Sequence, residues 1–191
     1  MSTQTVSLTG LKETLKQLDE LGRQGDQIAR DAATKAATLL RQTYLVQAIS
    51  SGTGIKSKTI MRYSYIKKAT AKYENARINF SGSGIPVTEY KYRLKRITDT
   101  RAKIMLEWLG GEKLAAGFIN PKGKKRAPLS TVNRKTKGSK TYTYRQGKME
   151  NALGPSLATI FLDMPQGMIK NEAQTLLSRE LTTLLDELLG E

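Results

Sequence analysis

The densest run of charged side chains in the sequence lies between Asn120 and Lys148. It contains ten Lys and Arg residues and no Asp or Glu. Cations at this density neutralise phosphates or meet acidic protein, and charge alone does not distinguish the two partners. The run has no fixed helical spacing, so we expect no base-specific readout. The predicted contacts with DNA or an acidic partner are Lys122, Lys124, Lys125, Arg126, Arg134, Lys135, Lys137, Lys140, Arg145 and Lys148.

A second basic group lies on strand-like segments that precede this run. We expect most of these side chains to form the solvent face of a sheet, because antiparallel strands alternate between core and solvent. The alternative is that some of them extend the same electropositive surface. The group consists of Lys67, Lys68, Lys72, Arg77, Lys91, Arg93, Lys95 and Arg96.

The net charge of +15 is concentrated in the middle of the chain. Residues 51–150 carry 24 basic and 6 acidic groups, whereas residues 151–191 carry 2 and 6. Acidic and basic patches within one sequence can join neighbouring copies head to tail in a ring. The candidate subunit interface on the acidic side is Glu172, Glu180, Asp186 and Glu187.

The sequence has no Cys and no His, which removes the usual nucleophile, the usual general base and the commonest zinc ligands. A metal-dependent nuclease would need clustered acids, and Asp99, Glu107 and Glu112 are the nearest approach to such a set. Their expected placement along a strand and its turn does not suit it. We therefore expect no enzyme activity, no metal site and no cofactor.

The length of 191 residues favours one domain over 1–191. No apolar run approaches the roughly 20 residues that span a bilayer, and the N-terminus has no signal-peptide pattern. We therefore expect a soluble protein of intracellular origin with no membrane partner.

Helices are predicted at both ends of the chain. A leucine stripe from Ser7 to Leu21 predicts a first helix, with Thr9 as its N-cap. Asp26 can cap a second helix that ends near Ser50, which gives a helical N-terminal segment over residues 7–50. Pro165 fits the first turn of a C-terminal helix over residues 165–190, whose apolar stripe extends to Leu188.

The middle of the chain, residues 58–150, predicts an antiparallel sheet of four or more strands, because apolar residues recur there with a two-residue period. Gly82 and Gly84 are expected to form a hairpin-like turn into Ile85, and Ala102–Trp108 is expected to be a strand. The basic run is expected to be a long β-arm or loop over residues 120–148. The predicted fold class is α+β, with both helical ends packed on this sheet.

Several local stretches resemble the minor tail protein Z family of long-tailed bacteriophages, also called tail completion proteins. They are Ile66–Thr70 running on to Asn75–Ile78, Ile85–Val87 and Ala116–Ile119. Gly154–Ser156, ahead of the last helix, looks like the broader group of neck and tail-completion proteins. Two departures concern the basic surface. The arginine-rich run of the family is thinner here, at Lys91–Arg96, and the loop after Asn120 is longer and richer in lysine.

The resemblance implies a structural protein at the head-proximal end of a phage tail, located in the virion and assembled in the host cytoplasm. It implies a self-assembled ring, which we expect to be six-fold. The implied neighbours are a tail terminator or tail tube protein, head-side connector proteins and the end of the packaged DNA. The alternative is a free-standing protein that binds nucleic acid without sequence preference.

Overall fold

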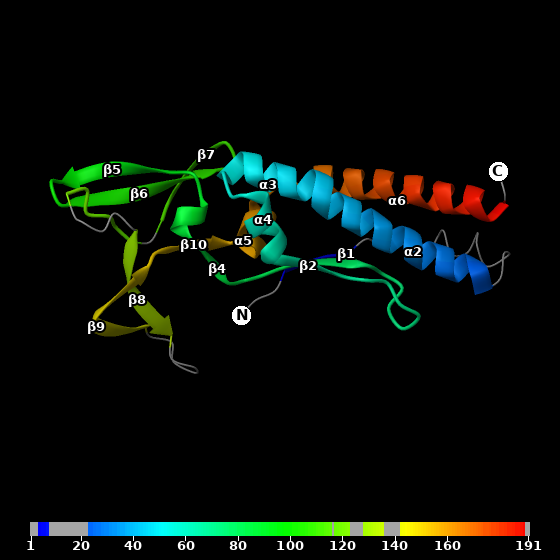
Figure 1. Cartoon of the computed structure of the whole chain (residues 1–191), viewed down its shortest axis with the longest axis horizontal. Helices are drawn as coiled ribbons and strands as arrows, with labels where there is room; N and C mark the ends of the chain where they lie inside the picture. The colour runs from blue at the N-terminus through cyan, green and yellow to red at the C-terminus, as the bar shows by residue number, and fades with distance from the viewer. Residues whose placement is uncertain (1–3, 8–22, 116, 123–127, 136–141, 190–191) are drawn as a thin grey trace.

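The computed structural model describes residues 4–7, 23–115, 117–122, 128–135 and 142–189. It confirms the α+β class with antiparallel strands. Figure 1 shows the helices α2 (Arg23–Leu39), α3 (Val46–Thr53) and α6 (Gln166–Leu189) along one side of an elongated molecule. The remaining elements are α4 (Ser57–Arg62), α5 (Leu157–Asp163), β1 (Gln4–Ser7), β2 (Ser64–Lys67), β3 (Arg77–Phe80), β4 (Gly84–Pro86), β5 (Tyr92–Thr98), β6 (Arg101–Trp108), β7 (Gly111–Leu114), β8 (Leu129–Lys135), β9 (Tyr142–Asn151) and β10 (Leu153–Ser156), with a π-helical turn η2 (Leu40–Leu45) and a 3-10 turn η3 (Val87–Glu89).

The N-terminal helical segment differs from the prediction at both ends. Ser7 belongs to strand β1, and the predicted first helix, with Thr9 as its cap, falls in 8–22, outside the described residues. Asp26 lies inside α2 and does not precede it. The helical path α2–η2–α3 continues to Thr53, where Gly54 ends it with a left-handed backbone at φ 69°. Five alanines on one face of α2 are fully buried, and this small-residue face packs against α6.

The strands within the described residues do not form one continuous sheet. They form four small antiparallel sheets, in the orders β1–β3–β2, β10–β4, β5–β6–β7 and β8–β9. The expected hairpin across Gly82 and Gly84 is wrong, because β4 pairs with β10 from the far end of the chain. A Cβ atom on Gly84 would lie 3.0 Å from the carbonyl oxygen of Gly154, so this pairing depends on a residue without a side chain.

The β5–β6–β7 sheet is attached to two helices, α3 and α5. The backbone nitrogens of Lys91 and Leu109 donate to the carbonyl oxygens of Thr53 and Gly52, at 3.1 and 2.7 Å, at the end of α3. A Cβ on Gly54 would lie only 2.3 Å from the Cβ of Lys91, which explains a glycine at this helix end. Trp108 Nε1 donates to Asp163 Oδ2 of α5 at 3.1 Å, and Lys113 Nζ of β7 lies 3.2 Å from the same oxygen. Backbone bonds to α3 and side-chain contacts with α5 therefore fix this sheet.

The C-terminal third contains two helices where one was predicted. Ser156 caps α5 by accepting a hydrogen bond from the backbone nitrogen of Thr159 at 3.2 Å. Pro165 precedes α6, and its carbonyl oxygen accepts from Ile169 at 3.4 Å. The apolar stripe of α6 is buried at its start, at Ile169 and Leu176, whereas Leu188 near its end is 41% exposed. Of the helices in the described ranges, none is long and apolar enough to cross a membrane.

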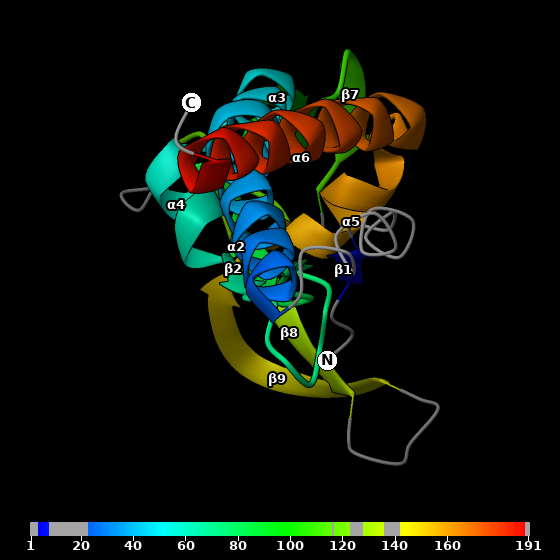
Figure 2. The same cartoon turned by 90° about the vertical axis from the view of Figure 1, so that its right-hand side faces the viewer.

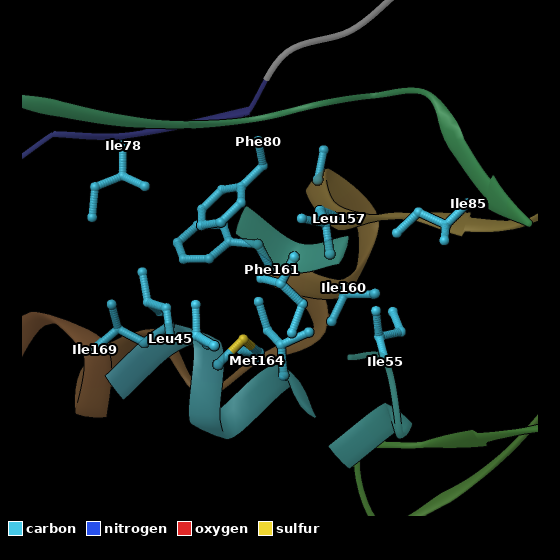
Figure 3. Packing of buried hydrophobic residues seen from close by; sticks show 14 of the residues in the cluster. Leu45, Ile55, Ile78, Phe80, Ile85, Leu157, Ile160, Phe161, Met164 and Ile169 are labelled. Carbon is cyan, nitrogen blue, oxygen red and sulfur yellow. The ribbon is translucent and has the colours of Figure 1, made fainter. Parts of the chain in front are cut away.

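The core lies between β3 and the helices and is shown in Figure 3. Phe80 of β3 and Phe161 of α5 stack with their ring centroids 4.9 Å apart and their planes 20° from parallel. Aliphatic side chains from η2, α5 and α6 lie around this pair, including Leu45, Ile160 and Ile169. The stack therefore joins the β1–β3–β2 sheet to the helical layer.

We expect Phe161→Ala to lower the free energy of unfolding by about 3–5 kcal/mol, because it removes a buried ring and leaves a cavity. The control is Leu162→Ala on the same helix, where the side chain is 55% exposed and the loss should be below about 1 kcal/mol. Urea unfolding followed by circular dichroism measures both. Equal losses for the two variants would contradict the assignment of this core.

We expect the free energy of unfolding to fall at alkaline pH because of the buried hydroxyl of Tyr90. Burial, with a smaller contribution from the nearby Tyr63, raises the pKa of its hydroxyl above the usual value. The hydroxyl donates to the carbonyl oxygen of Pro155 in β10, the partner strand of β4. Because the folded state holds this proton more tightly, the stabilisation is complete below about pH 10 and is lost as the pH rises further.

Tyr90→Phe should therefore cost about 1 kcal/mol at neutral pH, through the lost hydrogen bond, and progressively less above pH 10. Unfolding of both proteins at a series of pH values gives the difference directly, and the shared titration of lysines cancels. A difference that stays constant across this range would show that Tyr90 does not couple folding to its proton.

Candidate anion-binding surface

The β8–β9 hairpin carries four of the predicted contact residues on its backbone. Arg134 and Lys135 lie at the end of β8, in register with Thr143 and Tyr142 of β9. Arg145 and Lys148 lie further along β9. Figures 1 and 2 both show this hairpin on the side of the molecule away from α3 and α6, so these cationic positions project from the helical layer.

The rest of this predicted group is divided between one described residue and five others. Lys122 is exposed, and its Nζ lies 2.8 Å from Asp99 Oδ2. The remaining five, which are Lys124, Lys125, Arg126, Lys137 and Lys140, fall outside the described residues. The basic tip of the arm therefore remains a prediction, whereas the strands β8 and β9 at its base are paired.

Three members of the second basic group already have acidic partners. Lys91 Nζ lies 2.8 Å from Glu107 Oε2. Arg93 forms an ion pair with Glu112, and Arg96 forms one with Asp99. Because Glu107 and Glu112 face each other across β6 and β7, Lys91 and Arg93 compensate two like charges. Lys91, Arg93 and Arg96 are therefore paired with acids of the same chain, and less of their charge is available to an outside partner.

The same ion pairs involve Asp99, Glu107 and Glu112, the acids considered above for a metal-dependent nuclease site. Glu107 and Glu112 line a hollow of about 300 Å³ together with Lys91 and Arg93. Asp99 lies in the turn between β5 and β6 and contacts Arg96 and Lys122. Within the described ranges, no three Asp or Glu side chains come close enough to hold a metal ion.

Lys95 has no acid opposite it. It faces Lys103 across β5 and β6, and both side chains are exposed. Two like charges directly opposite on neighbouring strands destabilise the pairing. The pair leaves a local excess of positive charge on the outer face of this sheet.

The β2–β3 end collects the other four members of the second group. Lys67 of β2 is directly opposite Arg77 of β3, and Lys68 and Lys72 lie in the connection between these strands. All four side chains are exposed, and none forms an ion pair with a described residue. Lys72 Nζ instead lies 5.4 Å from the centre of the Tyr73 ring.

A hollow of about 200 Å³ lies at this end, lined by Lys67, Lys68, Tyr73, Asn75 and Arg77. Tyr73 and Asn75 were not among the site residues predicted from the sequence. Their position between two basic strand-like runs could have pointed to them, because aromatic and amide side chains often accompany cations in anion sites. The pairing register of β2 with β3, which brings these runs together, is visible only in the structure.

The acidic residues of α6 differ in their surroundings. Arg179 Nη2 lies 3.1 Å from Glu180 Oε1, and the Glu180 side chain is only 15% exposed. Glu172 is half-buried, whereas Asp186 and Glu187 are exposed. Of the four predicted interface residues, Asp186 and Glu187 are therefore the two that are free to meet a neighbouring copy.

We expect Lys95→Glu to raise the free energy of unfolding by roughly 0.2–1 kcal/mol, because it converts a repulsive cross-strand pair into an attractive one. Lys91→Glu is the matched control. It makes the same change of charge immediately before the same strand but breaks the contact with Glu107, and should lower stability. Urea unfolding at low salt measures both. If both variants gain stability equally, the effect comes from the overall net charge and not from the strand register.

The surface thus combines a projecting cationic hairpin, an ion-paired sheet and a cationic hollow with no acidic partner among the described residues. Comparison of the chain with protein-family models, with curated proteins and with solved structures gives no match.

Proposed function

We propose that the chain is a structural protein of a bacteriophage virion, which completes the tail or joins it to the head. In this proposal it acts in a ring around the DNA path at the head-proximal end of the tail. The observation that carries the proposal is a set of cationic positions on strands together with a separate pair of exposed acids on the last helix. The cationic positions lie on β2, β3, β8 and β9, and the acids Asp186 and Glu187 lie near the end of α6.

The position of the β8–β9 hairpin supports a surface that faces DNA. The hairpin lies away from α3 and α6, as Figure 2 shows. Its base carries Arg134, Lys135, Arg145 and Lys148. A conduit for DNA of any sequence needs phosphate neutralisation without base contacts, which is what lysine and arginine supply. An acidic neighbouring protein is the other partner that this hairpin would suit.

The exposed end of α6 supports contacts between subunits. Asp186 and Glu187 are exposed there, and the partly exposed stripe that ends at Leu188 lies on the same helix. A basic surface on the next copy would complete a head-to-tail contact that closes into a ring. The further partners in this proposal are a tail terminator or tail tube protein, the head-side connector proteins and the end of the packaged DNA.

The second candidate is a free-standing protein that binds nucleic acid without sequence preference. One specific observation favours it, because the hollow at the β2–β3 end is complete within a single chain. A monomer could bind nucleic acid there without assembling. The two candidates therefore differ in whether binding requires a ring.

Light scattering after size exclusion, at several protein concentrations and with or without a short DNA duplex, tests the proposal. We expect a closed ring, either of the chain alone or on addition of a tail tube protein, with weak binding of duplex before assembly. A monomer that binds duplex tightly, with a steep dependence on salt, would favour the free-standing protein instead.

The double variant Asp186→Lys, Glu187→Lys should prevent ring formation by reversing the charge at the end of α6. The control is Glu74→Lys, which reverses an exposed acid in the β2–β3 connection. The control should assemble as the unmodified chain does. If the α6 variant also assembles normally, the subunit contact lies elsewhere.

A further inference from the structure

We propose that the hollow at the β2–β3 end is a binding site for a phosphate group of a nucleic-acid backbone, held by Lys67, Lys68 and Arg77. The inference deepens the proposed function, and it rests on that function only for the source of the phosphate. The chemistry of the site is argued from the described residues alone.

The first argument is the strand register. Lys67 and Arg77 are Cα partners in the antiparallel pairing of β2 with β3. Side chains directly opposite on neighbouring strands lie about 4.5–5.5 Å apart at their Cβ atoms, and like charges at this distance destabilise the pairing. Lys68 adds a third cation at the same end. An anion between these side chains would turn the repulsion into attraction.

The second argument is the contrast with β6 and β7. There the like charges of Glu107 and Glu112 are also in register, and Lys91 and Arg93 compensate both. At the β2–β3 end, no described acid takes this role. The chain therefore supplies counter-ions for its acidic cross-strand pair, whereas the basic pair of Lys67 and Arg77 lines a hollow that is open to a ligand from outside.

The third argument is that the frame of the hollow is fixed before a ligand arrives. Ile66 and Ile78 pair on the core face of the same strands, and Ile78 is fully buried. The backbone nitrogen of Ala69 donates to Thr34 Oγ1 of α2 at 3.2 Å. The connection is closed by backbone bonds between Thr70 and Tyr73 at 2.7 and 3.0 Å. A frame that is already ordered reduces the entropy that a ligand must offset.

The residues that line the hollow favour phosphate over a carboxylate. A backbone phosphodiester carries the same single negative charge as a carboxylate, so charge does not separate the two ligands. A phosphodiester presents four oxygens where a carboxylate presents two, which suits the several donors that line the hollow. Asn75 brings an amide donor and Tyr73 a hydroxyl to the same hollow. The exposed Tyr73 ring also offers a surface on which an adjoining base can stack.

Isothermal titration with inorganic phosphate at constant ionic strength tests the site in the isolated chain. We expect saturable binding by the unmodified protein. Lys67→Gln and Arg77→Gln should each weaken it by about tenfold or more, since each removes a charged hydrogen-bond donor. Urea unfolding checks these variants, and they should be at least as stable as the unmodified chain because the repulsive pair is relieved.

Lys95→Gln is the matched control, because it removes one lysine from the other like-charged pair, Lys95 and Lys103. It should change phosphate binding by less than about twofold. An equal loss in this control would show that phosphate responds only to net charge and would overturn the site. No saturable binding of phosphate by the unmodified chain would overturn it as well.

A second titration compares a short 5′-phosphorylated DNA duplex with an acidic peptide of the same net charge. Tighter binding of the duplex, lost in Arg77→Gln and kept in Lys95→Gln, identifies a nucleic-acid backbone as the source. Tighter binding of the peptide in the same pattern would overturn the assignment to phosphate. Neither result depends on ring formation, so the site can stand if the chain proves to be a monomer, and it can fail while the ring stands.

Discussion

The stacked rings of Phe80 and Phe161 are the contact on which the arrangement of the fold depends. The sheets are small, and a sheet of two or three short strands has little stability by itself in water. Phe80 sits at the end of β3, and Phe161 belongs to a helix that begins more than seventy residues later. Their contact brings the β1–β3–β2 sheet and α5 to one core, which the helical layer then covers. Without it, the strands that display the cations would have no common support.

The sequence predicted the types of element better than their partners. A two-residue period identified β3 and β6 because each has one apolar face, and a leucine stripe identified α6. The same signals say nothing about which strands pair. Gly84 looked like part of a hairpin turn, but its missing side chain serves the approach of β10. Helix α5 was missed because its seven residues are too few for a clear helical period.

The candidate site shows the same limit. Lysines and arginines are visible in any sequence, but their counter-ions become visible only with the register. Lys91 and Arg93 looked equivalent to Lys67 and Arg77, yet the first two face acids and the last two face each other. Charge counting therefore overstated the available charge of Lys91, Arg93 and Arg96, which are paired with acids. Lys67, Lys68 and Arg77, which have no ion-pair partner among the described residues, line a hollow.

The attachment of the β5–β6–β7 sheet has a mechanical consequence. Backbone bonds from Lys91 and Leu109 hold the base of this sheet to the end of α3, and the bond from Trp108 to Asp163 holds it to α5. The sheet extends well beyond these anchors, as Figure 1 shows. The sheet is therefore held at the end of its strands nearest α3 and α5. A force applied near Asp99, in the turn of the β5–β6 hairpin, would act through this sheet on both α3 and α5, which contribute to the core.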